Sequence, residues 1–146
     1  MKERLNINEI NPAAFQAVMG MEKYSRGNID GQLLHLIKLR ASILNGCSFC
    51  VDMHSAEGLA DGMDSRKLFA VSAWREGPFF DEKERAALDL TDAVTRLGDH
   101  GVPDEIWDTA VEHYGEQGVG NLLMAIATIN VWNRLAVPAR KQPPNI

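Results

Sequence analysis

The sequence predicts an all-α protein, a bundle of about six to seven helices in a single domain. Apolar residues recur at helical spacing along the chain, and Gly, Pro, Asn and Asp residues separate these stretches. Strand signals are weak, because alternating runs of Val, Ile and Thr between tight turns do not occur. The length of 146 residues and the hydrophobic content of 45% fit one domain, residues 1–146, that buries a core.

Three helices are predicted in the first part of the chain. Asn11 is a favourable cap and Pro12 suits the first helical position, so a helix is expected from there to about residue 26. Asp30 caps a second helix, which extends to about residue 44 and ends at an Asn-Gly pair. A third helix begins near Cys47 and ends at about residues 58–62.

Four further helices are predicted after these. Asp64 caps a helix that ends at about residues 73–75, and Asp81 with Glu84 has the spacing of a capping box that opens a helix to about residue 97. Pro103, followed by two acidic residues, starts a helix to about residue 114. The last helix, about residues 117–136, is apolar almost all round, so it should lie centrally or against another subunit. The Pro-rich tail, residues 138–146, is expected to be flexible.

The charge and the apolar pattern exclude several classes of partner. A net charge of −5 and a pI of about 5.3 argue against nucleic acid and anionic membrane surfaces. Charged or amide residues interrupt each long apolar run, and no apolar segment follows the charged start, so we expect neither a membrane span nor a secretory signal. The expected location is cytoplasmic. Because structural disulfides are rare there, the two cysteines indicate catalysis, redox sensing or metal binding.

The cysteines form a CxxC pair followed by a histidine. In a helix that begins near Cys47, the side chains of Cys47, Cys50 and His54 fall within an arc of about 60° on one face. The positive end of the helix dipole and a neighbouring imidazole both favour a thiolate. Such a thiolate could attack the O–O bond of a hydroperoxide, and the resulting sulfenic acid could condense with the second cysteine to a disulfide. This reaction needs no metal, haem or flavin, so we expect no cofactor.

The two activating effects point to different cysteines. The helix start favours Cys47, whereas His54 lies one turn beyond Cys50 at the spacing that suits a direct hydrogen bond. We favour Cys50 as the attacking thiol and Cys47 as its resolving partner. The field of the helix dipole still reaches Cys50, whereas the spacing that suits a hydrogen bond with His54 is specific to Cys50.

A CxxC pair also occurs in other kinds of protein site. A thioredoxin-like domain would need a βαβ surround that the chain lacks. A structural zinc site needs four ligands, and only Cys47, Cys50 and His54 are good candidates, so no metal site is predicted. A non-catalytic thiol redox switch, a metal-binding module and a pair of inert buried cysteines stay as alternatives.

The motif NGCxxCxxxH after LxxLIKLRAS resembles the core of the carboxymuconolactone decarboxylase superfamily, in its alkylhydroperoxidase D-like branch. The resemblance is strongest in the CxxC core, about residues 25–75, and continues to about Val137 through the segments SAWRE, FF, ERAAL and ATINVWNRL. It implies an all-helical fold that assembles into homo-oligomers and reduces a hydroperoxide substrate at the expense of an external dithiol reductant. A decarboxylase or related lyase of the same superfamily is the alternative enzyme, although such members generally lack the cysteine pair.

By position, the resemblance implies that Cys50 reacts with peroxide, Cys47 is its disulfide partner and His54 relays the proton. Two residues depart from the family pattern. His35 stands where the family usually has a glutamate, and Phe49 stands where founding members have a histidine. His35 could replace the glutamate as a base, since imidazole titrates near neutral pH, or it could be a structural histidine.

Two further expectations concern residues away from the motif. Arg40 falls within an apolar helix face, so its burial would require a carboxylate partner. Trp74, Phe79, Phe80 and Trp132 are candidates either for a hydroperoxide pocket or for ordinary packing.

Overall fold

The computed structural model describes residues 2–144, and this part of the chain is built from helices without a β-strand. The all-α prediction is therefore confirmed. The elements are α1 (Ile7–Ile10), α2 (Pro12–Asn28), α3 (Gly31–Leu44), α4 (Ser48–Ala60), α5 (Ser65–Ala70), the 3-10 turn η1 (Val71–Ala73), α6 (Glu82–Thr95) and α7 (Asp104–Ala139).

The predicted caps begin the helices as expected. The side chains of Asn11, Asp30, Asp64 and Asp81 each accept a hydrogen bond from a backbone N–H group in the first turn that follows. At α6, Glu84 also bonds back to the N–H of Asp81, which completes the capping box. Capping acts over three residues, and this short range explains why the sequence predicts these starts well.

The short helix α1 was not predicted, because its four residues show no apolar periodicity. The two helices predicted last are both present: α7 consists of two helices that meet at a kink, where the backbone of Gly115 (φ 68°, ψ 168°) is not helical. Glycine adopts this positive φ without a steric penalty, so the chain bends there and then resumes its helix.

The helix α7 also ends later than predicted. The predicted tail begins at Pro138, but the helix includes Pro138 and ends at Ala139, followed by the C-cap residue Arg140, which has a left-handed backbone (φ 55°). Arg4 covers this end, since its N–H donates to the Ala139 carbonyl at 2.8 Å and its Nη1 donates to the Pro138 carbonyl at 3.2 Å. The end of the predicted tail, residues 145–146, lies outside the described residues.

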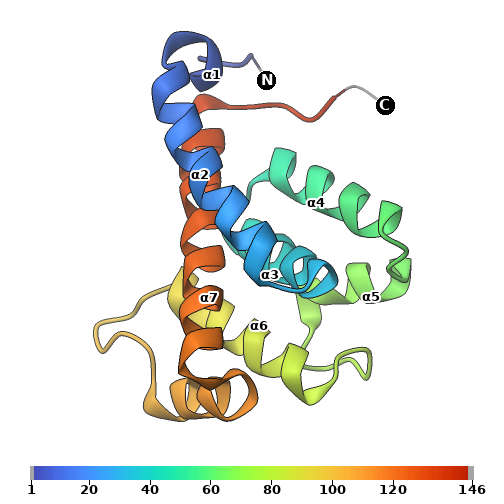
Figure 1. The fold of residues 1–146 in the computed structure, drawn as a ribbon. Coiled ribbons are helices and arrows are strands. Elements are labelled where there is room, and N and C mark those ends of the chain that lie inside the picture. Colours follow the sequence, from blue (N-terminus) through green and yellow to red (C-terminus); the bar gives the residue numbers. More distant parts are fainter. Residues whose placement is uncertain (1, 145–146) are drawn as a thin grey trace.

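The central element of the bundle is α7, against which α2, α3 and α6 pack, while α4 lies on the outer side of α3 (Figure 1). By length and composition alone α7 could also cross a membrane, but a buried core helix of a folded domain meets the same criterion. The main core cluster contains Leu34, Ile37, Ala87, Leu90, Ala110, Val119, Leu122, Ala125 and Ile126. Burial of each such Leu or Ile side chain contributes about 1.5–3 kcal/mol, so this contact fixes α3 and α6 on α7.

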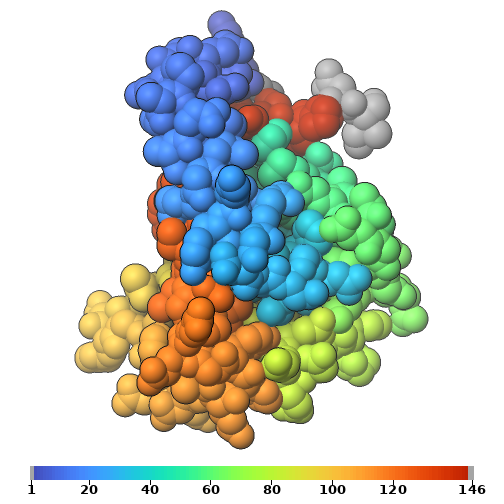
Figure 2. Space-filling model, viewed as in Figure 1, coloured from blue at the N-terminus to red at the C-terminus, as the bar shows by residue number. Residues whose placement is uncertain are grey.

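The two ends of the chain meet above the start of α4. Figure 2 shows the C-terminal segment between the N-terminal helices and α4. Lys141 places its Nζ 4.4 Å from the centre of the Phe49 ring on α4, which ties the segment after α7 to the CxxC region.

Candidate active site

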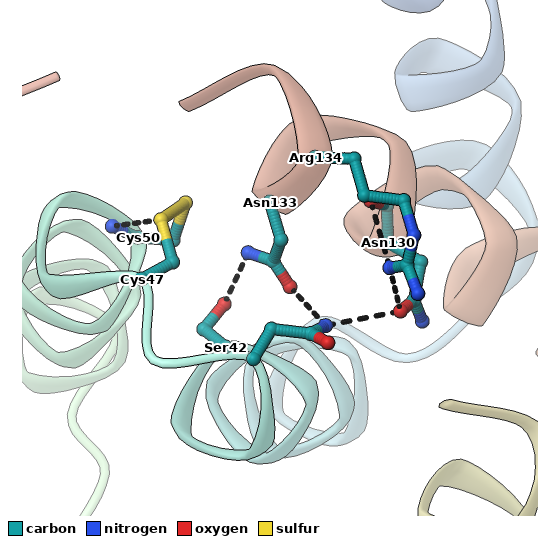
Figure 3. Close-up of a disulfide and its surroundings, with 7 residues drawn as sticks. Ser42, Cys47, Cys50, Asn130, Asn133 and Arg134 are labelled. Carbon is teal, nitrogen blue, oxygen red and sulfur yellow. Dashed lines mark hydrogen bonds between the residues drawn. A yellow bond between two sulfur atoms is a disulfide. The ribbon is translucent and has the colours of Figure 1, made fainter. Parts of the chain in front are cut away.

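The cysteine pair lies at the N-terminus of α4. Cys47 is the N-cap residue and Cys50 lies in the first turn, with 5.4 Å between their Cα atoms and a disulfide between their sulfurs (Figure 3). The backbone N–H of Cys50 donates to Cys47 Sγ at 3.4 Å. Both residues are buried. The structure thus represents the oxidised form of a pair that the sequence placed one helical turn apart.

A polar network on α7 holds the turn before Cys47. The Asn45 side chain donates to Asn133 Oδ1 at 2.8 Å and to Asn130 Oδ1 at 3.0 Å, and Asn133 in turn donates to Ser42 Oγ at 3.1 Å (Figure 3). Gly46 has a φ of 66°, a conformation that favours glycine. These contacts set the direction in which α4 leaves α3, and therefore where the sulfurs lie.

His54 lies one turn after Cys50 and is bonded to a carboxylate. Its Nδ1 is 2.9 Å from Glu57 Oε2. Burial lowers the pKa of His54 to about 4, because desolvation outweighs the hydrogen bond with Glu57, and the charge of Lys38 lowers it further. Burial would raise the pKa of Glu57, but its bonds to His54 and Arg26 bring it below the usual value. Near neutral pH the geometry therefore assigns the proton to Nδ1, which donates to the carboxylate.

This arrangement leaves the other ring nitrogen of His54 with a lone pair. His54 Nε2 is buried and has no hydrogen-bond partner among the described residues. Cys50, His54 and Glu57 all contribute to the lining of one pocket. A neutral imidazole with a free nitrogen, on a residue that lines the same pocket as Cys50, can act as a general base once the disulfide is reduced to thiols.

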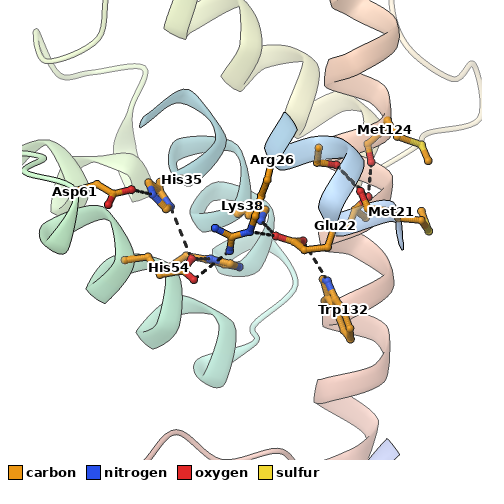
Figure 4. A network of polar contacts seen from close by, with 12 residues as sticks. Met21, Glu22, Arg26, His35, Lys38, His54, Asp61, Met124 and Trp132 are labelled. Carbon is orange, nitrogen blue, oxygen red and sulfur yellow. Dashed lines mark hydrogen bonds and ion pairs between the residues drawn. The ribbon is translucent and has the colours of Figure 1, made fainter. Parts of the chain in front are cut away.

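Charged residues from α2 and α3 support Glu57. Arg26 donates to Glu57 Oε1 at 3.1 Å and to Glu22 Oε1 at 2.7 Å, and the buried Lys38 is paired with the same Glu22 oxygen (Figure 4). Trp132 Nε1 also donates to Glu22, at 3.4 Å. Although burial would raise the pKa of Glu22, these cations lower it, so Glu22 stays ionised.

Sequence reasoning missed this network. Glu22 and Arg26 lie four residues apart on α2, a spacing at which helical side chains meet, but Lys38 comes from α3 and Glu57 from α4, and no spacing rule connects the three helices. Glu57 could have been found, because it follows His54 by three residues, a separation at which helical side chains meet.

His35 lies on α3, beside Glu57 and away from the disulfide. Its Nε2 is 2.7 Å from Asp61 Oδ2, and its Nδ1 is 3.8 Å from Glu57 Oε2 (Figure 4). The side chain is buried. The predicted site residues are therefore all brought to one region, with His35 in an outer position. The carboxylate bonded to His54 is Glu57, on the same helix as the cysteines.

A pocket of about 280 Å³ lies between α2, α4 and α7. Cys50 is among its lining residues and Cys47 is not. Much of its wall is apolar, formed by Phe15, Met19, Phe49, Met53, Trp132 and Leu135.

The predicted aromatic residues divide between this pocket and the core. Trp132 lines the pocket, whereas Trp74, Phe79 and Phe80 pack with Leu88 and its neighbours in a second core cluster. The pocket alternative is thus wrong for these three, because they follow α5, pack with Leu88 of α6 and are not among the residues that line the pocket.

Metal binding was an alternative for the cysteines. The group that could supply three ligand atoms consists of His35, His54 and Glu57, whose atoms lie within 4.8 Å of one another. A cation there would compete with the His54–Glu57 bond and with Arg26, which already bonds the same carboxylate. We therefore interpret the three residues as a hydrogen-bonded relay.

The predicted ion pair of Arg40 is confirmed, and it lies outside the pocket. Arg40 Nε and Nη2 bond Asp92 Oδ1 and Oδ2 at 2.5 and 2.9 Å, which joins α3 to α6. Trp74 Nε1 donates to the same carboxylate at 3.2 Å.

Residues 12–93 match the model of the carboxymuconolactone decarboxylase family. The uncharacterised protein YdfG of Bacillus subtilis (strain 168) is 36% identical over 138 residues, which is 94% of each chain. The uncharacterised protein YnjA of Escherichia coli (strain K12) is 28% identical over 113 residues, 77% of this chain and 62% of that protein.

Two solved structures share the fold. ATU0492 of Agrobacterium tumefaciens, a protein of unknown function provisionally assigned to antioxidant defence as AhpD, is 43% identical with a TM-score of 0.96 and matches over 99% of this chain and 100% of its own. The apo debrominase Bmp8 is 24% identical with a TM-score of 0.82, over 92% of this chain and 73% of its own, which shows a common fold alone.

Proposed function

The chain belongs to the carboxymuconolactone decarboxylase family as an AhpD-like member, and on this premise we propose that it is a thiol-dependent peroxidase that reduces organic hydroperoxides. One observation carries the proposal. Of the two cysteines, Cys50 alone lines the pocket, and it shares that pocket with a neutral histidine whose free nitrogen can accept a proton. The provisional assignment of ATU0492 to antioxidant defence agrees with it.

In the oxidative half of the cycle, His54 Nε2 takes the proton from the Cys50 thiol. The thiolate attacks one oxygen of the hydroperoxide, the O–O bond breaks, and the leaving alkoxide takes a proton to become an alcohol. Cys50 is then a sulfenic acid. The Cys47 sulfur attacks Cys50 Sγ, and hydroxide leaves with the Cys47 proton as water. Two thiols and one hydroperoxide thus yield the disulfide, an alcohol and water.

In the reductive half, an external dithiol attacks the disulfide at Cys50, the residue that lines the pocket. Cys47 leaves as a thiolate, and the N–H of Cys50, which already donates to Cys47 Sγ, stabilises that charge at the helix N-terminus. The second thiol of the reductant then displaces Cys50. The imidazole of His54, which activates Cys50, therefore serves the oxidative half of the cycle. The helix N-terminus, which stabilises the Cys47 thiolate, serves the reductive half.

The apolar wall of the pocket favours a hydroperoxide with a hydrocarbon or aromatic body over hydrogen peroxide. Homo-oligomerisation and a cytoplasmic location belong to the same proposal. Exposed apolar side chains such as Ile10, Phe69 and Leu97 support assembly, because a subunit contact would remove them from water.

The test compares wild-type protein with Cys50→Ser and Cys47→Ser, all pre-reduced, in an assay of cumene hydroperoxide consumption with dithiothreitol. Wild type should turn over, and Cys50→Ser should lose turnover with an unchanged helical circular dichroism spectrum. Cys47→Ser should form one sulfenic acid per chain, trapped by dimedone.

Each contrary result has its own meaning. Full activity of Cys50→Ser would show that Cys50 is not the nucleophile. A wild-type protein that cycles between dithiol and disulfide without consuming hydroperoxide would instead be a thiol switch, and the peroxidase proposal would be wrong.

A further inference from the structure

Most charged side chains that line the pocket are paired with one another, and Lys141 is an exception. Arg26 bonds both Glu22 and Glu57, so these three charges satisfy each other. Lys141 lines the same pocket, but its Nζ has neither an ion-pair nor a hydrogen-bond partner within residues 2–144. The proposed cycle gives this ammonium group no role. A lysine placed in this way is available to bind an anion.

The turn after α7 holds Lys141 against the first turn of α4. The N–H of Lys141 donates to the Ala136 carbonyl at 3.0 Å, and the next bond towards the helix runs from the N–H of Arg140 to the Val137 carbonyl, at 3.1 Å. With the left-handed backbone of Arg140, these bonds form a Schellman motif, which fixes the direction of the chain as it leaves the helix. The side chain of Lys141 is partly buried, and its Nζ is 4.4 Å from the centre of the Phe49 ring. The ammonium group therefore lies at the part of the pocket wall that Phe49 forms.

The two ends of the chain bring further positive charge to this side of the pocket. They lie side by side, because the N–H of Arg4 donates to the Ala139 carbonyl (Figure 2). Residues 2–6 and 138–144 together carry four basic side chains and one acidic side chain, in a protein with 15 basic and 20 acidic residues. These side chains are Lys2, Glu3, Arg4, Arg140 and Lys141. Such a local excess of positive charge attracts anions and raises their concentration near the site.

We propose that Lys141 binds the carboxylate of the substrate, and that the preferred substrates are fatty-acid hydroperoxides. This inference rests on the proposed function and names the class of hydroperoxide. The hydrocarbon chain of such a substrate packs against apolar side chains of the pocket such as Phe15, Met19 and Leu135. The carboxylate takes no part in the reaction at Cys50, so the hydroperoxide becomes an alcohol and the acid group stays intact.

The acidic residues of the pocket do not cancel this preference. Glu22 and Glu57 are both paired with Arg26, so their charges are compensated. Glu3 lines the pocket too, but its side chain is exposed, so water and salt screen its charge. The partly buried Lys141 is screened less. A carboxylate in the pocket is therefore attracted more strongly than an amine of the same shape.

The first experiment measures binding to the disulfide form of the protein, without peroxide. Isothermal titration calorimetry compares octanoate, 1-octanol and octylammonium, which share one hydrocarbon chain and differ in the charge of the head group. The proteins are wild type, Lys141→Gln, Lys141→Arg and, as a matched control, Lys83→Gln. Lys83 also lies over an aromatic ring, with its Nζ 5.3 Å from the centre of Tyr114, but it lines a different pocket.

Wild type should bind octanoate most tightly and octylammonium most weakly. Lys141→Gln should weaken octanoate binding about fivefold, equal to about 1 kcal/mol, which an ion pair at a partly exposed site can contribute. Lys141→Arg should recover most of the affinity, and Lys83→Gln should bind octanoate as wild type does. Bound octanoate should also slow the reduction of the disulfide by dithiothreitol, because Cys50 lines the same pocket.

Turnover of the reduced protein gives a second measurement. The substrates are linoleic acid hydroperoxide and its methyl ester, which differ in the negative charge of the head group. The ratio of kcat/KM for the acid to kcat/KM for the ester should fall about fivefold in Lys141→Gln, mainly through a higher KM for the acid. Lys83→Gln should keep the wild-type ratio.

Three results would each overturn the proposal: equal affinity of wild type for octanoate and 1-octanol, unchanged octanoate binding in Lys141→Gln, or a loss of equal size in Lys83→Gln. Octanoate that binds without slowing the reduction of the disulfide would lie outside the pocket, which also overturns it. The binding experiment contains no hydroperoxide. If octanoate binds through Lys141 but wild type consumes no hydroperoxide, the carboxylate site stands and the peroxidase proposal alone is wrong.

Discussion

Two clusters of charged residues in this protein have similar chemistry, but they differ in whether all of their polar groups have hydrogen-bond partners. The cluster around Arg40 and Asp92 joins α3 to α6, and Arg40 also donates to the Ser72 carbonyl at 3.0 Å, so the guanidinium nitrogens of Arg40 have acceptors and both Asp92 oxygens have donors. The cluster around Glu22 and Glu57 joins α2, α3 and α4, but it leaves a ring nitrogen of each adjacent histidine free. We call the Arg40–Asp92 cluster closed and the Glu22–Glu57 cluster open. The closed cluster can only hold helices together, whereas the open cluster can also accept a proton at a histidine nitrogen.

Substitutions in the closed cluster should affect the stability of the protein and leave its activity unchanged. Asp92→Ala should lower the free energy of unfolding by about 3–5 kcal/mol, because Arg40 is left buried without its partner. Urea denaturation measures this loss, and Asp99→Ala, at an exposed loop position, is the control. The folded fraction should keep the wild-type turnover per molecule, so a large loss of turnover in folded Asp92→Ala would contradict the distinction.

The open cluster should instead make stability depend on pH. The pKa of His54 is about 4 in the folded protein and about 6.5 in an unfolded chain, so the unfolded chain binds more protons between these values. The stability from this group is complete above pH 6.5 and is lost as the pH falls towards 4. Between pH 7 and 5 the loss should be about 2 kcal/mol. Urea denaturation of wild type and His54→Gln at both pH values checks this. The free energy of unfolding of the variant should lack the part of the pH dependence that His54 contributes.

Removal of one charge in the open cluster should affect catalysis more than stability. Glu57→Gln should reduce kcat/KM for cumene hydroperoxide by about 100-fold, equal to about 2.7 kcal/mol, because a neutral amide no longer holds His54 as an effective base. Steady-state kinetics and thermal unfolding separate the two effects. Unchanged kinetics in a folded variant would mean that Glu57 serves packing, like Asp92.

Features within a few residues of chain were predictable. The caps at Asn11, Asp30, Asp64 and Asp81 depend on backbone groups in the next turn, and they begin the helices as predicted. The placement of Cys47, Cys50 and His54 near one another follows from the period of an α-helix. Pro138 misled the prediction of the last helix end, because the helix continues through it to Ala139, where Arg4, distant in the sequence, donates to the carbonyls of Pro138 and Ala139.

The sequence by itself determined the helical architecture and the local cluster of two thiols and an imidazole, because capping and helical spacing act over three or four residues. Only the tertiary structure decided that Cys50 lines the pocket, that Arg26 of α2 bonds Glu57 of α4, and that His35 of α3 bonds Asp61. These properties depend on burial and on contacts between α2, α3, α4 and α7, and burial sets how strongly each charge is felt.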